Sequence, residues 1–174
     1  TKEISRSHKL IREKSGLITI IGGKWTTYRK MAQDTLDLAI RYMHIPTKDC
    51  ITERYQIHGS RKNPDFSDPL YVYGTDADEI RNLVASSPAM AEKLHPDYAY
   101  TVGEVTWLVR NEMPRTLEDV LARRLRILFL DARAAMAMAP KVAGILATEW
   151  GKDETWTSAQ VKAFNEVASN YILN

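Results

Sequence analysis

Cysteine is almost missing from this sequence: Cys50 is the only one in 174 residues. A single cysteine cannot form a disulfide within the chain, which fits a reducing compartment, and we expect a cytoplasmic protein. The histidines His8, His44, His58 and His95 show no spacing typical of metal ligands. We therefore predict no metal site.

An excess of charge of one sign is also lacking. The chain has 24 basic and 22 acidic residues, a net charge of +2, and this balance does not indicate a protein that binds nucleic acid. No apolar run approaches the roughly 20 residues that a membrane-spanning helix needs. Residues 1–6 are not typical of a signal peptide, because no apolar stretch follows them. Since the chain does not open with methionine, we expect it to be part of a longer protein, called the parent below.

Size and composition otherwise fit an ordinary globular protein. Hydrophobic residues make up 44% of the chain and charged residues 26%, as is usual for a folded domain. A chain of 174 residues is long enough for one domain with its own core, or for a small domain attached to a fragment of another.

The first 45 residues have the pattern of a strand, a turn and a helix. Residues 17–21 form a β-branched apolar run that ends at Gly22 and Gly23, and this run predicts a buried strand. Apolar side chains then recur at three- and four-residue spacing over residues 25–43, which predicts a helix with one face toward a sheet. Pro46 marks the end of that helix.

The amino-acid composition changes after residue 45. Prolines and glycines alternate with Asn, Asp and Ser up to about Gly74, and this composition predicts an irregular connection. A short strand over residues 54–57 is an alternative within it. The chain beyond Gly74 has a helical pattern almost to its end. Pro140 interrupts one apolar stripe, where we expect a kink or a new helix start. The predicted helices cover residues 75–86 and 103–113, a segment that begins near Thr116, residues 132–150, and a last helix capped by Thr157 or Ser158.

The turn after the first predicted strand has the chemistry of an anion site. The first turn of a helix leaves backbone N–H groups unpaired, and here two glycines and Lys24 lie at that point. The segment is not a P-loop, because Ile18 stands where the first glycine is required and Trp25 follows the lysine. The alternative is a tight strand-to-helix turn that carries an exposed lysine.

Two segments carry a resemblance to a known family. Residues 22–32, with Ile4, Ser5 and Arg6 upstream, resemble the flavin-proximal signature of FAD-dependent glycerol-3-phosphate dehydrogenases and the related glycerophosphate oxidases. Residues 104–113 and 116–124 resemble the hallmark of the C-terminal helical domain of that family. The two signatures occur in the expected order, and the likeness covers nearly the whole chain.

The resemblance implies a fold class and a domain organisation. We expect a mainly α chain, a C-terminal helical bundle that follows a strand–turn–helix remnant of an α/β FAD-binding domain. Residues 1–45 would end the FAD- and substrate-binding domain, residues 46–70 would be a linker, and residues 71–174 would form a helical cap.

The resemblance also implies site residues. In the family the Gly-Gly-Lys turn lies against the isoalloxazine ring, so Gly23, Lys24, Trp25 and Thr26 are the expected FAD-binding residues. A helix N-terminus and a lysine there would stabilise the reduced flavin, which tends to be anionic. Arg6 matches the arginine that helps to hold the substrate phosphate, a task that suits its planar fork. No catalytic residue is expected in this chain.

The parent would oxidise sn-glycerol 3-phosphate to dihydroxyacetone phosphate through FAD and pass the electrons to quinone. The alternative for the acceptor is oxygen, as in an oxidase. The catalytic histidine and the dinucleotide-binding unit of the family lie upstream of this chain, so we expect the chain alone to bind FAD negligibly and to be inactive. We expect the parent to be cytoplasmic, with a peripheral site at the inner face of the cell membrane as a further option.

A different kind of function stays open for the helical part. It would be a non-enzymatic module for docking or for homo-oligomer formation, and an arginine-lined patch would be its contact surface. Ion pairs on and between helices are the competing interpretation, because charges of both signs recur there at helical spacing. The residues concerned are Arg110, Glu112, Glu118, Asp119, Arg123, Arg124 and Arg126.

Overall fold

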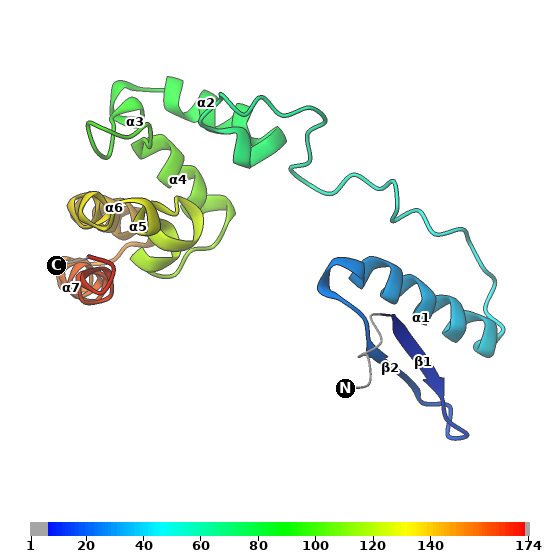
Figure 1. Cartoon of the computed structure of the whole chain (residues 1–174). Coiled ribbons are helices and arrows are strands. Elements are labelled where there is room, and N and C mark those ends of the chain that lie inside the picture. The colour runs from blue at the N-terminus through cyan, green and yellow to red at the C-terminus, as the bar shows by residue number, and fades with distance from the viewer. Residues whose placement is uncertain (1–6, 173–174) are drawn as a thin grey trace. The chain divides into compact units, whose positions relative to one another are not determined.

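The computed structural model describes residues 7–172. It divides the chain into two compact units, Thr1–Ile57 and His58–Asn174, and the colours of Figure 1 run from blue in the first unit to red at the end of the second. The strands within residues 7–172 lie in the first unit, whereas the second unit is built from helices. The prediction of a mainly α chain that begins with a strand–turn–helix element is confirmed.

The first unit opens with a two-stranded antiparallel sheet. Strand β1 (His8–Arg12) pairs with strand β2 (Ile18–Gly22), and Leu10 lies opposite Ile20. The turn between them contains Gly16 at a φ of +91°, a left-handed conformation that suits a residue without a Cβ atom. Strand β2 confirms the predicted strand within one residue. Strand β1 was not predicted, because its sequence HKLIR offers no apolar run.

One helix covers this sheet. A single 3₁₀ turn, η1 (Trp25–Thr27), leads into helix α1 (Tyr28–Met43), as predicted. The helix ends at His44, which has a left-handed φ of +53° and donates its N–H to the carbonyl oxygen of Ile40. Pro46 follows two residues later, where it can no longer disturb the helix.

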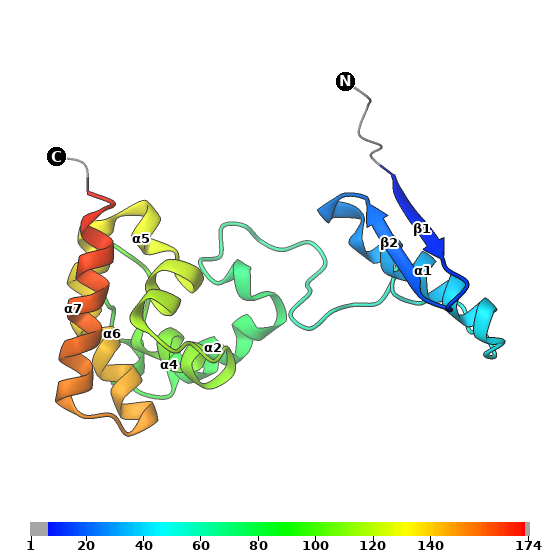
Figure 2. The same ribbon diagram turned by 90° about the horizontal axis from the view of Figure 1, so that it is seen from below.

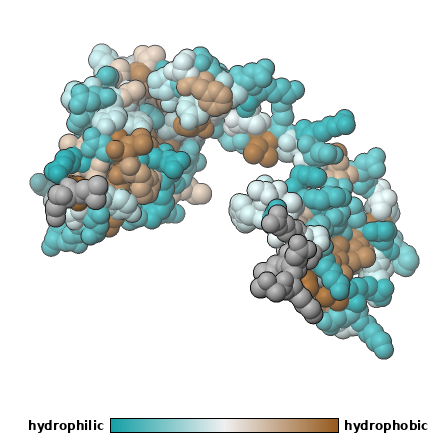
Figure 3. Space-filling view, viewed as in Figure 1, coloured by the Kyte–Doolittle hydropathy of each residue, from teal (hydrophilic) through white to brown (hydrophobic). Residues whose placement is uncertain are grey.

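The burial predicted for the strand is wrong. None of residues 7–57 is buried, and the side chain of Ile21 in β2 remains 49% exposed. A two-stranded sheet with one helix has too little apolar surface to enclose a core. Apolar side chains therefore lie at the surface of this unit, where Figure 3 shows them in brown.

The connection after α1 is irregular, as predicted, and the alternative strand over residues 54–57 does not form. Arg54 instead closes a turn by donating its N–H to the carbonyl oxygen of Ile51 at 3.1 Å. Further along, the Thr75 N–H donates to the Gly59 carbonyl oxygen at 3.2 Å. A Cβ atom on Gly74 would lie 1.6 Å from that same oxygen, so only glycine allows this close approach. Residues near Gly59 are thereby fixed to the start of the helical unit.

The second unit contains a succession of short and long helices. Two of them, α6 and α7, are long and lie side by side, as both Figure 1 and Figure 2 show. No helix within residues 7–172 combines the length and the apolar character that crossing a membrane would require. The elements are η2 (Tyr71–Asp76), α2 (Ala77–Ala85), α3 (Pro88–Ala91), α4 (Val102–Asn111), the π-helical segment η3 (Asp119–Arg124), α5 (Ile127–Leu130), α6 (Ala132–Trp150) and α7 (Glu154–Ser169).

Helix α6 is the centre of the core. It packs against α4, α5 and α7, and its small residues Ala135, Ala139 and Ala143 are completely buried. Small side chains at this spacing let neighbouring helices approach closely, and larger ones fill the remaining space. The larger, fully buried side chains include Ile80, Leu108, Leu117, Leu121, Ile127, Met138 and Leu146.

The predicted cap of the last helix is wrong, and of the two alternatives at Pro140 the new helix start does not occur. Helix α7 is capped by Asp153, whose carboxylate accepts the Trp156 N–H at 2.8 Å, and so Thr157 and Ser158 lie within the helix. No new helix begins at Pro140, because α6 continues through it. Buried residues on both sides of this exposed proline, Ala139 and Val142 among them, hold the helix against its neighbours.

Candidate functional site

The turn between β2 and α1 contains the residues predicted to bind the flavin. Its two glycines, Gly22 and Gly23, have φ values of +76° and +86°, a region that disfavours other residues. A Cβ atom on Gly23 would lie 2.5 Å from the Met31 sulfur. The positive φ therefore favours glycine here whether or not a ligand approaches, and a Cβ atom would also displace the end of the Met31 side chain.

Thr27 closes this turn onto Lys24. The Lys24 N–H donates to the Thr27 hydroxyl oxygen at 3.2 Å, and that hydroxyl donates to the Lys24 carbonyl oxygen at 2.9 Å. These contacts fix the backbone of Lys24, and they leave its side chain free to extend. Within residues 7–172, the Lys24 ammonium group makes no hydrogen bond or ion pair.

The next two residues present the open end of the helical segment. Trp25 and Thr26 begin the first turn, where backbone N–H groups have no carbonyl partner within a helix. The Trp25 side chain is 88% exposed, and its ring lies 5.8 Å from that of Tyr28 between centroids. Gly23, Lys24, Trp25 and Thr26 thus form one exposed turn that can receive an anion. Arg6 lies outside the described residues.

A hydrogen-bonded group ties helix α1 to the sheet. The Asp34 carboxylate on α1 contacts Nε2 of His8 on β1 at 2.9 Å, and it accepts a hydrogen bond from the Lys30 ammonium at 2.7 Å. The Lys30 hydrogen bond, with help from His8, lowers the pKa of Asp34 below its usual value. The contact fixes the start of α1 relative to β1. Sequence reasoning missed it, because β1 itself was not predicted.

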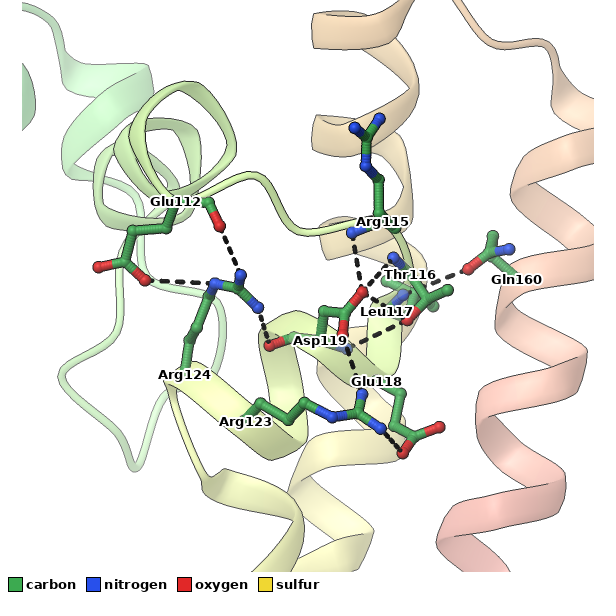
Figure 4. Close-up of polar contacts among 9 residues, drawn as sticks. All are labelled: Glu112, Arg115, Thr116, Leu117, Glu118, Asp119, Arg123, Arg124 and Gln160. Carbon is green, nitrogen blue, oxygen red and sulfur yellow. Dashed lines mark hydrogen bonds and ion pairs between the residues drawn. The ribbon is translucent and has the colours of Figure 1, made fainter. Parts of the chain in front are cut away.

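In the helical unit, the charged segment forms a compact cluster of hydrogen bonds and ion pairs around Asp119, called the Asp119 cluster below (Figure 4). One oxygen of its carboxylate accepts the backbone N–H groups of Arg115 at 2.8 Å and Thr116 at 3.0 Å, and the other accepts from Arg123 at 3.0 Å. Partial burial works to raise the pKa of Asp119, but these N–H groups, the Thr116 hydroxyl and Arg123 together hold it below the usual value. Asp119 thus organises the start of η3.

Arg124 and Leu117 connect this cluster to its surroundings (Figure 4). The Arg124 guanidinium group donates to the Asp119 carbonyl oxygen at 2.9 Å and pairs with the Glu112 carboxylate at 3.2 Å. The Leu117 N–H donates to the Gln160 side-chain oxygen on α7 at 3.2 Å. The loop between α4 and η3 is therefore held on both sides.

The predicted ion pairs are confirmed for most of the charged set. Arg110 on α4 makes two hydrogen bonds of 2.7 Å to the Glu149 carboxylate on α6, and Arg123 contacts Glu118 at 2.6 Å. Arg126 has no ion pair within residues 7–172 and stands at a left-handed φ of +60°. This segment therefore stabilises the bundle, and it does not present a row of unpaired arginines.

The fold and the turn together define the class: a helical domain preceded by a strand–turn–helix element whose exposed turn carries a lysine. Comparison with protein families agrees. Residues 17–157 match the family model for the C-terminal domain of alpha-glycerophosphate oxidase, and the chain belongs to that family.

Individual relatives extend the match over the whole chain. A probable mitochondrial glycerol-3-phosphate dehydrogenase of Caenorhabditis elegans is 34% identical, over 99% of this chain and 26% of that protein. One of Dictyostelium discoideum is also 34% identical, over 99% of this chain and 29% of that protein. The mitochondrial enzyme of Mesocricetus auratus is 30% identical over 99% of this chain and 26% of its own length. The chain thus spans less than a third of these relatives, which are oxidoreductases by name.

The names of these relatives correct one prediction. The expected cytoplasmic location is wrong, because the three relatives are described as mitochondrial. The prediction rested on the single cysteine, Cys50. A low cysteine content indicates a reducing compartment and does not distinguish one such compartment from another.

Proposed function

We propose that this chain is the C-terminal part of an enzyme that oxidises sn-glycerol 3-phosphate at C2 to dihydroxyacetone phosphate. A hydride would pass to FAD, a proton would leave the hydroxyl group, and the electrons would pass on to a quinone. The observation that carries the proposal is the family match over residues 17–157, together with relatives named glycerol-3-phosphate dehydrogenases that align over 99% of the chain.

The exposed turn fits an anionic ligand such as the edge of a reduced flavin. Its donors are the ammonium group of Lys24 and the free N–H groups of Trp25 and Thr26, and no carboxylate within residues 7–172 pairs with the lysine. FAD would supply the two-electron acceptor, and these residues would stabilise negative charge on it. Gly23 would keep the turn in shape by leaving room for Met31.

Arg6 would bind the phosphate group of the substrate. A guanidinium group can donate two parallel hydrogen bonds to phosphate oxygens, which orients the substrate as well as binding it. The helical unit, whose core is complete in itself, would act as a cap on the catalytic part of the parent. The chain alone would lack most of the flavin site and would be inactive.

The test is glycerol-3-phosphate-dependent reduction of a dye by the full-length parent, with three variants numbered as in this chain. Arg6→Ala should raise KM strongly, because it removes binding of the phosphate. Lys24→Ala should lower kcat by about ten-fold or more, since it removes a charge that acts on the reduced flavin. Lys14→Ala, an exposed lysine in the turn between β1 and β2, is the matched control and should change neither constant.

Three outcomes would count against the proposal. Full activity of both Arg6→Ala and Lys24→Ala would remove the two site assignments. A wild-type parent without activity on glycerol 3-phosphate would contradict the substrate. Replacement of the dye by a quinone or by oxygen then tests the acceptor, and faster turnover with oxygen would contradict the quinone and favour an oxidase.

A further inference from the structure

The helical unit contains a cavity of about 620 Å³. It lies between helices α2, α3 and α4, and the segments 68–70 and 98–101 complete its wall. Its volume falls within the range of pockets that hold small molecules in proteins. Most of its lining is apolar, and the side chains responsible are Pro69, Leu70, Ile80, Val84, Ala85 and Ala91.

Most polar side chains in the wall already have hydrogen-bond or ion-pair partners, some of them outside the wall. Arg81 pairs with Asp68 and also contacts Asp78. The Tyr98 hydroxyl donates to the Asp131 carboxylate at 3.0 Å, and the Tyr100 hydroxyl donates to the Leu125 carbonyl oxygen at 2.9 Å. The charges of Arg81 and Asp68 are therefore neutralised, and the hydroxyl groups of Tyr98 and Tyr100 are already hydrogen-bonded.

Glu104 is the exception. It lies in the first turn of α4, it is only 4% exposed, and it is one of the residues that line the cavity. Tyr73 donates a hydrogen bond of 2.7 Å to one carboxyl oxygen. Within residues 7–172, however, Glu104 has no cationic partner. A buried carboxylate without a counter-charge is costly, and this cost makes Glu104 unusual among the acidic residues of the unit.

The surroundings of Glu104 act in opposite directions on its charge. Burial raises the pKa of Glu104, whereas the hydrogen bond from Tyr73 and the Thr101 backbone work to lower it. Burial also raises the pKa of Tyr73, and the nearby Glu104 adds to that effect. Tyr73 therefore stays protonated and serves as a permanent donor. A cation in the cavity would complete this arrangement by supplying the missing positive charge.

We propose that this cavity binds a small apolar amine, with its ammonium group at Glu104 and its apolar body among the side chains of α2 and α3. The apolar lining favours burial of a hydrocarbon or aromatic body. The carboxylate selects a positively charged end, because a charge-assisted hydrogen bond is stronger than a neutral one. The site is separate from the turn around Lys24 and does not depend on the activity proposed for the parent.

Calorimetric titration of the 174-residue chain at neutral pH tests the proposal with three probes of one shape: 4-phenylbutylamine, 4-phenylbutanol and 4-phenylbutyrate. The amine should bind about ten- to a hundred-fold more tightly than the alcohol, which is the range expected for one charge-assisted hydrogen bond. The acid should not bind, since its charge repels that of Glu104. Equal affinity for all three probes, or binding of none, would overturn the proposal.

Two pairs of variants locate the site. Glu104→Gln should remove the preference for the amine over the alcohol, whereas Glu166→Gln, an exposed position on α7, should preserve it. Ala85→Trp should fill the cavity and abolish binding, whereas Ala163→Trp, also exposed on α7, should not. Loss of binding in both members of a pair, or in neither, would contradict the assigned site. If Glu104→Gln fails to fold, the order of the three probes on the wild-type chain still decides.

Discussion

The two units of this chain differ in how they are stabilised. Residues 7–57 include the exposed turn and bury no residue, whereas the helical unit encloses a continuous core around α6. A unit with a complete core can keep its fold alone, whereas a small unit that buries no residue gains little stability from apolar burial. The difference indicates that the turn proposed to bind a ligand gains little stability from burial in its own unit, whereas the helical unit is stabilised by its own core.

The largest expected effect lies in the core of the helical unit. Leu121→Ala removes a completely buried side chain, and the free energy of unfolding should fall by about 2–5 kcal/mol. Leu36→Ala on α1 is the matched control, since Leu36 is 61% exposed and its loss should cost about 0.5 kcal/mol or less. Urea denaturation measures both. Equal losses would break the contrast between the units.

The second effect concerns the Asp119 cluster. Asp119→Ala removes the acceptor for two backbone N–H groups and for Arg123, and the unfolding free energy should fall by about 1–2 kcal/mol. The corresponding change at Asp97, whose side chain is 80% exposed, should have little effect. Thermal unfolding distinguishes the two variants. An Asp119→Ala protein as stable as the wild type would mean that the Asp119 cluster does not stabilise the fold.

The third effect is local to the first unit. Gly23→Ala places a Cβ atom at a positive φ and against Met31, and it should destabilise the turn by about 1–2 kcal/mol. Amide hydrogen exchange should speed up in η1 and α1 and remain unchanged in α6. Faster exchange in α6 would show that the two units do not unfold separately.

The smallest effect is a pH dependence at Glu104. Burial raises its folded-state pKa, so its contribution to stability is complete below the unfolded-state value and is lost as pH rises through the folded-state value. Glu104→Gln cannot lose a proton, and its stability relative to the wild type should therefore increase as pH rises from about 4 toward 7. Denaturation at several pH values measures the difference. A relative stability that falls with pH would contradict the raised pKa.

Local patterns predicted much of this fold. The apolar run before Gly22 and the spacing of residues 25–43 correctly predicted β2 and α1, and the helix predicted over residues 103–113 corresponds to α4 within two residues. These signals succeeded because each depends on the sequence of one element. Strand β1 was not predicted, because its conformation depends on pairing with β2 and its own sequence gives no sign of that pairing.

Contacts between distant residues were beyond sequence reasoning. The cap of α7 is a different case, because Asp153 lies three residues from Trp156 and aspartate is itself a favoured cap, so the error was a wrong choice among local signals. The exposed turn was found from its glycines and Lys24, yet the closeness of Met31 to Gly23 depends on packing. The cavity beside Glu104 could not be predicted at all, because its walls come from segments as far apart as residues 68 and 104.

The most direct test of the central claim is the absorption spectrum of the purified full-length parent. The account predicts one bound flavin per parent molecule, and it predicts that anaerobic addition of glycerol 3-phosphate bleaches the flavin band. The 174-residue chain, purified in the same way, should be colourless. A parent without flavin, or a flavin band that glycerol 3-phosphate leaves unchanged, would contradict the claim that this chain completes an enzyme that oxidises glycerol 3-phosphate.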